Sequence, residues 1–162
     1  METYRAVGKH PVVVGAEVGA AVGAAVGAAV GAAVVVGADT VVLIDNLVLG
    51  KPRDTAEAKR MLARLSGRSH DVLTGVVLMR DARVREGVEL THVTLARLAD
   101  QRIEWYVATG EPADKAGAYA VQGIGSRFVE RIDGSYTNVV GLPVCQVVEM
   151  MQELGAEDVL PF

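Results

Sequence analysis

Apolar and polar positions form their most informative pattern between residues 34 and 52, VVVGADTVVLIDNLVLGKP. A run of valines gives way to a polar pair, Asp39 and Thr40, and a second apolar run then continues to Ile44. Runs of this length that are rich in β-branched residues predict a buried strand. Because Asp is depleted in strands and is costly to bury without a partner, the polar pair indicates a functional position within that strand.

A tight turn is predicted directly after this strand, at Asp45 and Asn46. Leu47 to Leu49 then return the chain and lead into the tripeptide Gly-Lys-Pro, which contains Lys51. We expect this hairpin to bring Lys51 back towards Asp39, where a carboxylate and an ammonium group would suit a metal-bound phosphate. The alternative is that Asp39 caps a turn and that Lys51 is a solvated loop lysine.

The rest of the apolar pattern predicts helices and strands that alternate along the chain. The expected elements are a helix over 54–65, strands over 71–79 and 88–98, a helix over 100–109, a glycine-rich loop over 110–125, a short strand over 128–132, a loop over 134–143 and a last helix to residue 154. A polar turn over 80–87 is expected to join the two long strands. This interleaving predicts the α/β class.

Each predicted helix has one apolar face. The first begins with a capping box formed by Asp54 and Glu57. The expected buried positions are Ala58, Met61, Leu62 and Leu65 in the first helix, Ile103, Tyr106 and Val107 in the second, and Val144, Val147, Val148, Met151 and Leu154 in the third. Cys145 lies in the last pattern and is expected to be a small core residue.

Residues 1–33 form a different region, a lead segment dominated by a low-complexity repeat of Val, Gly and Ala. The uncharged stretch from Val18 to Ala38 is long enough to span a membrane as a helix. Gly and Ala are only weakly apolar, however, and no Trp or Tyr flanks the run, so a span is the less favoured interpretation. A strand with every repeat Val on one face, or a poorly packed segment, are the other interpretations.

Composition narrows the functional classes. The chain has 162 residues, the size of one domain, and its formal net charge is −4. That charge argues against general nucleic-acid affinity and against a polybasic membrane patch. A single cysteine excludes an internal disulfide and fits a cytoplasmic protein. The three histidines show no metal-ligand spacing.

Several blocks of sequence resemble one family in its order and at its usual spacings. GADTVV, GKPRD, MLARLSGRSHDVLTGV, IEWYVATGEPADKAGAYAVQG and GSYTNVVGLP together resemble the Maf family of nucleoside triphosphate pyrophosphatases, from about Val34 to Leu154. The resemblance implies a Maf-like mixed sheet with flanking helices over residues 34–158. It also implies hydrolysis of a nucleoside triphosphate to the monophosphate and pyrophosphate, with a divalent cation, usually Mg2+, and a homodimer.

The resemblance also assigns roles to five residues. Asp39 matches the catalytic Asp that accepts a proton from the attacking water, and as a carboxylate it is also the expected metal ligand. Thr40 and Gln122 match two positions tied to base selection, and their residue types resemble the branch that acts on dTTP and UTP. Lys51 matches a lysine that neutralises phosphate, and Lys115 lies in a substrate loop.

One part of the family pattern is missing from this sequence. Family members normally open with a strand that carries Ser-x-Ser-Pro-Arg-Arg, followed by a helix, and neither the motif nor these elements are found in residues 1–33. The first strand and helix are therefore expected to be missing or replaced. This departure leaves two alternatives to an active enzyme: a catalytically impaired nucleotide-binding relative, and a membrane-tethered form that uses Val18–Ala38 as a span.

Overall fold

The computed structural model describes residues 3–7, 10–14 and 34–157. Its centre is a five-stranded sheet with the strand order β4-β3-β5-β6-β7, in which every neighbouring pair is antiparallel. The strands are β3 (Val34–Ile44), β4 (Leu47–Leu49), β5 (Ser69–Arg80), β6 (Arg83–Leu95) and β7 (Val129–Asp133). A separate antiparallel pair is formed by β1 (Thr3–Val7) and β2 (His10–Val14).

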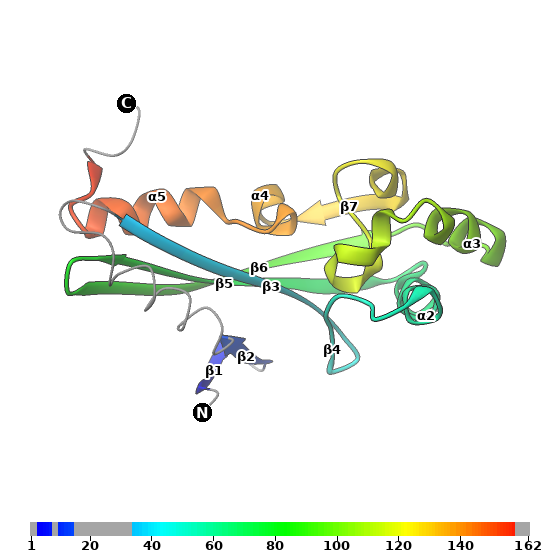
Figure 1. Cartoon of the computed structure of the whole chain (residues 1–162), viewed down its shortest axis with the longest axis horizontal. Helices are drawn as coiled ribbons and strands as arrows, with labels where there is room; N and C mark the ends of the chain where they lie inside the picture. Colours follow the sequence, from blue (N-terminus) through cyan, green and yellow to red (C-terminus); the bar gives the residue numbers. More distant parts are fainter. Residues whose placement is uncertain (1–2, 8–9, 15–33, 158–162) are drawn as a thin grey trace.

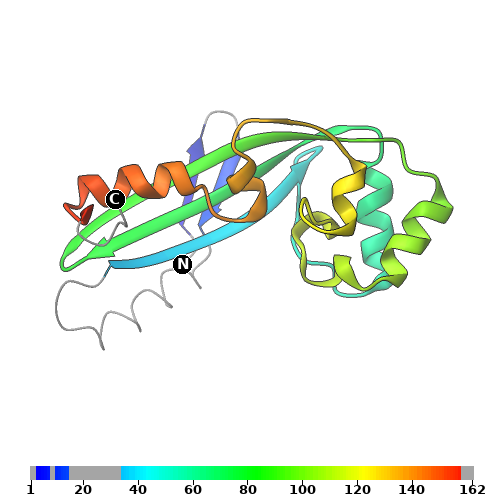
Figure 2. The same cartoon turned by 90° about the horizontal axis from the view of Figure 1, so that it is seen from above.

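Helices gather along the sheet and at one of its ends (Figures 1 and 2). Helices α4 (Tyr136–Val140) and α5 (Val144–Glu153) lie along one face, while α2 (Thr55–Leu65) and α3 (Asp100–Ala108) pack together at the end where β4 lies. Three short 3-10 helices, η1 (Glu111–Asp114), η2 (Ala116–Ala118) and η3 (Ile124–Phe128), form the predicted glycine-rich loop. The predicted α/β class is confirmed.

The turn between β3 and β4 has the predicted position and chemistry. Asp45 and Asn46 have φ angles of 52° and 60°, and the flanking residues Ile44 and Leu47 are cross-strand partners. Two consecutive left-handed residues are what a two-residue hairpin with a type I′ turn requires, and Asp and Asn tolerate this conformation better than most residues.

Helices α2 and α3 also form as predicted. The Asp54 carboxylate accepts a hydrogen bond of 2.7 Å from the backbone N–H of Glu57 and so caps the first turn of α2. The predicted faces are buried: Ala58, Met61, Leu62 and Leu65 in α2, and Ile103, Tyr106 and Val107 in α3.

The buried face of α5 differs from the prediction: Met150 is buried although it was not predicted, and Val148 and Met151 are only partly buried. Cys145 is exposed and is not a core residue, and Val144 is 46% exposed. The residues that pack on Val76 and Leu78 of β5 belong to a second hydrophobic cluster and include Val147, Met150, Leu154 and Ala156. Helix α5 therefore contacts the sheet mainly after its first turn, which leaves its first two residues in solvent.

The hairpin of β5 and β6 is tighter than its polar sequence suggested. The two strands are joined at Asp81 and Ala82, and pairing begins at once between Arg80 and Arg83. Residues 81–86 are exposed, so polar side chains can continue the strand there without a desolvation cost. At its other end β6 stops at Leu95, three residues before the predicted end, and the predicted loop over 134–143 contains the short helix α4.

The two faces of the sheet carry different residues because side chains alternate along each strand. The helix-covered face includes Val42, Val72 and Val93, which belong to the largest hydrophobic cluster with residues of α2 and α3. The second face carries a smaller cluster built on Leu43 and Leu73. Alternation thus assigns even-numbered residues of β3 and β5 to the helix-covered face.

Among the described residues, no helix is both long enough and apolar enough to cross a membrane. The last five residues of the span considered above, Val34 to Ala38, belong to β3 and pair with β5. The repeat over residues 15–33 lies outside the described residues.

Candidate functional site

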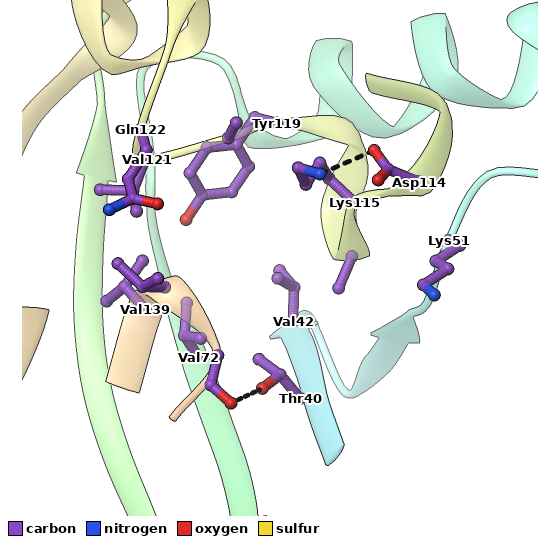
Figure 3. A pocket seen from close by; sticks show the side chains of 14 residues that line it. Thr40, Val42, Lys51, Val72, Asp114, Lys115, Tyr119, Val121, Gln122 and Val139 are labelled. Atoms are coloured by element: carbon purple, nitrogen blue, oxygen red, sulfur yellow. Dashed lines mark hydrogen bonds and ion pairs between the residues drawn. The ribbon is translucent and has the colours of Figure 1, made fainter. Parts of the chain in front are cut away.

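A pocket of about 350 Å³ opens between the helix-covered face of the sheet, the loop over 110–125 and helix α4 (Figure 3). Strand β3 contributes Thr40 and Val42, β5 contributes Val72, and the segment after β4 contributes Lys51. The other lining residues come from the loop, namely Asp114, Lys115, Ala116, Tyr119, Ala120, Val121 and Gln122, and from the end of α4, namely Val139, Val140 and Gly141.

Four of the five residues that the sequence assigned to the site line this one pocket: Thr40, Lys51, Lys115 and Gln122. They come from β3, from the segment that follows the β3–β4 hairpin, and from the loop over 110–125, which is distant from both in the sequence. The β3–β4 hairpin returns Lys51 to the pocket, and the backbone N–H of Gly117 donates to the carbonyl of Gly50 at 3.1 Å, which ties the loop to the end of that hairpin.

Asp39 is placed differently. Its cross-strand partner on β5 is Gly75, whereas the partner of Thr40 is Thr74, and the pairing of β3 with β5 runs without a bulge through this region. Alternation therefore puts the Asp39 side chain on the second face of the sheet, and it is exposed and absent from the pocket lining. Of the two residues that the hairpin was expected to bring together, Lys51 lines the pocket and Asp39 does not, and the catalytic role of Asp39 stays a prediction.

Strand β3 is nevertheless an edge at this point. Strand β4 pairs only with the stretch from Val42 to Ile44, so among the described strands β5 alone borders Asp39 and Thr40. The two side chains therefore lie on opposite faces of the outermost described strand at this point.

The hydroxyl of Thr40 is held by its neighbours. It forms a hydrogen bond of 2.8 Å with the hydroxyl of Thr74 and lies 3.5 Å from the carbonyl oxygen of Gly141. Thr74 in turn donates to the carbonyl of Asn138 at 3.3 Å. Side chains fixed in this way present a defined polar edge to a ligand, because little conformational freedom remains to be lost on binding.

Charge is distributed unevenly around the pocket. In Figure 3, Lys51, Asp114 and Lys115 lie on one side, whereas Gln122, Val121 and Val139 lie on the other. Lys115 forms an exposed ion pair of 2.7 Å with Asp114, and the hydrogen bond from Lys115 lowers the pKa of the Asp114 carboxyl. The pocket therefore fits a ligand with an anionic end and an uncharged polar end.

Tyr119 is a lining residue to which sequence reasoning assigned no role. It is 5% exposed, and its hydroxyl lies 2.8 Å from Nε2 of the buried His70 on β5. The only signal in the sequence was its position between Lys115 and Gln122 in the glycine-rich loop.

The donor set for a metal ion is small. Among the described residues, no three His, Cys, Asp or Glu side chains form a group that could hold a metal ion by themselves. Mg2+ is commonly bound by one or two carboxylates together with phosphate oxygens of the substrate and water. Asp114, a carboxylate in the pocket lining, thus fits a cation that arrives with a phosphorylated ligand, whereas the Asp39 side chain lies on the second face of the sheet.

The fold and the pocket define an α/β protein with a site for a small ligand that carries both negative charge and an uncharged polar group. The chain matches the model of the Maf-like protein family over residues 9–154 and belongs to that family.

Curated relatives carry a common name. The chain is 53% identical over 122 residues to a dTTP/UTP pyrophosphatase of Symbiobacterium thermophilum, 53% identical over 127 residues to one of Anaeromyxobacter dehalogenans, and 46% identical over 121 residues to one of Pyrococcus furiosus. Each comparison covers 75% of this chain and 63%, 65% and 63% of the respective relative. The chain thus spans a little less than two thirds of the length of these relatives.

Proposed function

We propose that this protein hydrolyses dTTP and UTP, and modified nucleotides related to them, to the nucleoside monophosphate and pyrophosphate. The observation that carries the proposal is the pocket itself, which brings Thr40, Lys51, Lys115 and Gln122 together with the two ammonium groups away from the amide. The names of the relatives agree with this choice of substrate. In the reaction, water attacks the α-phosphorus, the bond to the bridging oxygen breaks, and pyrophosphate leaves.

Each residue has a role that its chemistry supports. The amide of Gln122 can both donate to and accept from the edge of a pyrimidine base, and Thr40 adds a fixed hydroxyl beside it. Lys51 and Lys115 offset the charge of the triphosphate, which is the main requirement of phosphoryl transfer besides positioning. Asp39 is the proposed proton acceptor for the attacking water, reached by the phosphate chain around the edge of β3.

A divalent cation, preferably Mg2+, completes the proposal, with Asp39 as its proposed protein ligand. When bound, such a cation neutralises the charge that develops on the phosphate oxygens. A cytoplasmic location and a homodimer are also proposed, on the basis of the composition and the family resemblance respectively.

The assay that tests the proposal measures pyrophosphate release from dTTP, UTP, dCTP and GTP in the presence of Mg2+. We expect turnover of dTTP and UTP at rates well above those of the other two nucleotides. Absence of pyrophosphate release from every nucleotide would contradict the proposed activity.

Gln122→Glu tests base selection separately from catalysis. A carboxylate accepts hydrogen bonds but cannot donate, so a base carbonyl loses its partner. We expect kcat/KM for dTTP relative to GTP to fall by about tenfold or more, since an unpaired buried polar group costs about 1–3 kcal/mol. If the ratio of kcat/KM for dTTP to that for GTP does not change, Gln122 has no role in base selection.

A second candidate function is nucleotide binding without efficient hydrolysis. The observation that favours it is the register of β3, which puts Asp39 on the face opposite the pocket. The two candidates differ in one measurement: a binder retains affinity for the nucleotide analogue 2′-deoxyuridine 5′-(α,β-imido)triphosphate, yet releases no pyrophosphate from dTTP.

A further inference from the structure

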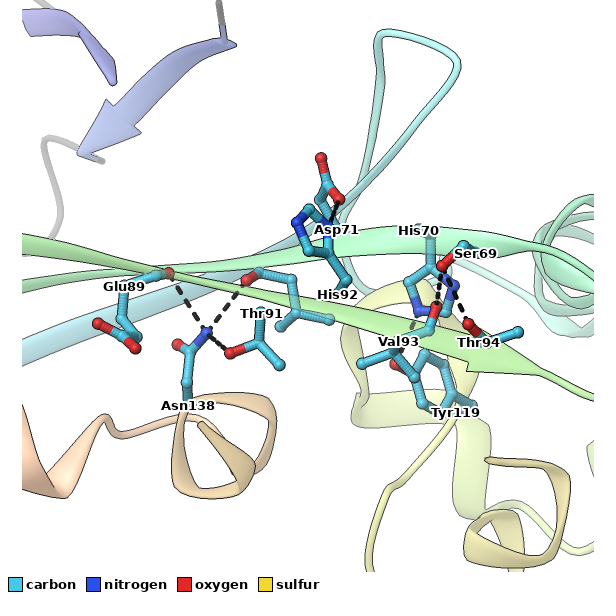
Figure 4. A network of polar contacts seen from close by, with 11 residues as sticks. Ser69, His70, Asp71, Glu89, Thr91, His92, Val93, Thr94, Tyr119 and Asn138 are labelled. Carbon is cyan, nitrogen blue, oxygen red and sulfur yellow. Dashed lines mark hydrogen bonds and ion pairs between the residues drawn. The ribbon is translucent and has the colours of Figure 1, made fainter. Parts of the chain in front are cut away.

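His70 and Tyr119 form a buried pair (Figure 4), of which Tyr119 also lines the pocket. Strand β5 supplies His70, which is 3% exposed, and the glycine-rich loop supplies Tyr119. Besides the 2.8 Å hydrogen bond, the rings meet edge to face, with centroids 5.4 Å apart and an interplanar angle of 81°. Two independent contacts therefore fix the orientation of the Tyr119 ring.

The protons of this pair can be assigned by counting donors and acceptors. Burial lowers the pKa of His70 to about 4, so its ring is neutral at pH 7 and carries one proton. Nδ1 of His70 is buried and has no hydrogen-bond partner among the described residues. A proton on Nδ1 would create a buried N–H without an acceptor, which is rarer in proteins than an unpaired acceptor. The proton therefore belongs on Nε2, which donates it to the Tyr119 oxygen.

This assignment leaves the phenolic proton of Tyr119 unused by His70. Burial raises the pKa of Tyr119 above its usual value, so the phenol keeps that proton. In Figure 3 the hydroxyl end of Tyr119 points away from the loop backbone into the space that is also lined by Gln122, Val139 and Val42. A donor without an assigned acceptor thus faces the uncharged side of the pocket.

We propose that Tyr119 is a base-recognition residue in addition to Gln122. Its phenolic hydroxyl donates a hydrogen bond to a carbonyl oxygen of a uracil- or thymine-type base, and His70 positions the Tyr119 side chain. The inference rests on the proposed function. Uracil and thymine present two carbonyl acceptors and one N–H donor. An amide that both donates and accepts, together with a phenol that donates, matches such an edge.

The central experiment measures dissociation constants for 2′-deoxyuridine 5′-(α,β-imido)triphosphate with Mg2+ by calorimetry. Tyr119→Phe keeps the ring and removes the donor, and we expect the affinity to fall about tenfold to a hundredfold. Tyr136→Phe is the control, because Tyr136 is a phenol that is 48% exposed and does not line the pocket. Its affinity is expected to stay within about twofold of the parent.

Sulfur analogues test the contact without any substitution in the protein. Sulfur is a weaker hydrogen-bond acceptor than oxygen, so the parent protein should bind one of 2-thio-UTP and 4-thio-UTP more weakly than UTP. In Tyr119→Phe that difference should disappear. If the parent binds all three nucleotides equally, the proposed contact does not exist, whatever the variants show.

The role of His70 is tested with His70→Phe. We expect this variant to lose affinity as Tyr119→Phe does and to lose the discrimination against the same thio analogue, which a merely structural role would not affect. The double variant should bind no more weakly than either single variant, because both act on one contact. If the affinity losses of the two single variants add in the double variant, His70 does not act through Tyr119.

The outcomes also separate this inference from the proposed function. If the parent binds the imido analogue but does not discriminate against either thio analogue, the inference about Tyr119 is wrong and the proposed function stands on its pyrophosphate assay. If the parent binds the analogue, discriminates as expected and releases no pyrophosphate, base recognition is supported and the proposed hydrolysis fails. If no nucleotide binds, both are wrong.

Discussion

The two faces of the five-stranded sheet hold their polar side chains in opposite ways. On the helix-covered face, His70, Thr74 and Thr91 are buried and bonded to neighbours from the loop and from α4. On the second face, Asp39 is exposed, and Nδ1 of His92 lies at hydrogen-bond distance, 2.6 Å, from the Asp71 carboxylate while the His92 side chain remains about half exposed.

This difference separates two kinds of task. Neutral polar groups that are buried and fixed are suited to discriminating between ligands, because an unpaired partner in such a site is costly. Charged groups at an exposed edge keep their charge at little cost and are suited to phosphate and metal chemistry. We interpret the helix-covered face as the selective part of the site and the edge around Asp39 as its proposed reactive part.

The largest expected effect comes from Asp39→Asn. The substitution is nearly isosteric and removes the charge, so kcat for dTTP should fall by about a thousandfold, within the range typical of a lost general base. The thermal midpoint should not change, because the side chain is exposed. Steady-state kinetics with dTTP measures kcat, and thermal unfolding of the purified variant measures the thermal midpoint.

Asp81→Asn is the control for this experiment, since Asp81 is an exposed acid in the β5–β6 turn with φ of 55°, a conformation that Asn also accepts. It should leave kcat unchanged. Full activity in Asp39→Asn would show that the second face takes no part in the reaction.

Asn138→Asp tests the rigidity of the helix-covered face. The Asn138 amide is fully buried and donates to the carbonyls of Val72 and Glu89 and to the hydroxyl of Thr91, at 3.1, 3.3 and 3.0 Å. A carboxylate would face these acceptors without donors, so we expect the free energy of unfolding to fall by about 3 kcal/mol. Asn138→Ala should cost less, about 2 kcal/mol, because it removes the donors without adding a charge. Denaturant titration measures both, and equal stability of the three proteins would contradict this account of α4.

The buried His70 predicts a pH dependence of stability. Its folded pKa, about 4, lies below the unfolded value of 6.5. The unfolded chain therefore binds a proton first as the pH falls, so the stability that is present above pH 6.5 is lost between pH 6.5 and pH 4. The contribution amounts to about 2 kcal/mol lost between pH 7 and pH 5.

Comparison with His70→Phe isolates this contribution from that of the carboxylates. The difference in unfolding free energy between parent and variant should shrink by that amount between pH 7 and pH 5. A difference that is independent of pH would show that His70 is not held in its neutral form.

His92→Phe should have the smallest effect. Its partner Asp71 makes a further contact, and a hydrogen bond between partly exposed side chains at the surface contributes about 1 kcal/mol or less. We expect a change in unfolding free energy within that limit at pH 7. A larger loss of unfolding free energy would show that polar contacts on the second face matter as much for stability as those on the helix-covered face.

The sequence by itself determined the elements whose causes are local. The turn at Asp45 and Asn46, the cap at Asp54 and the apolar faces of α2 and α3 follow from residues a few positions apart, and all formed as predicted. The sequence also identified four residues that line one pocket, because the resemblance to a family carries long-range information that periodicity lacks.

Tertiary structure alone decided what depends on register and on contacts between distant segments. The pairing of β3 with β5 determines that Thr40 faces the pocket and Asp39 faces away from it, since a shift by one residue exchanges the faces. The rotation of α5 on the sheet exposes Cys145, which was predicted to be a core residue, and buries Met150, which was not in the predicted apolar face. His70 and Tyr119 meet only because strand and loop fold together, and such a contact is set by packing geometry rather than by any local preference of the chain.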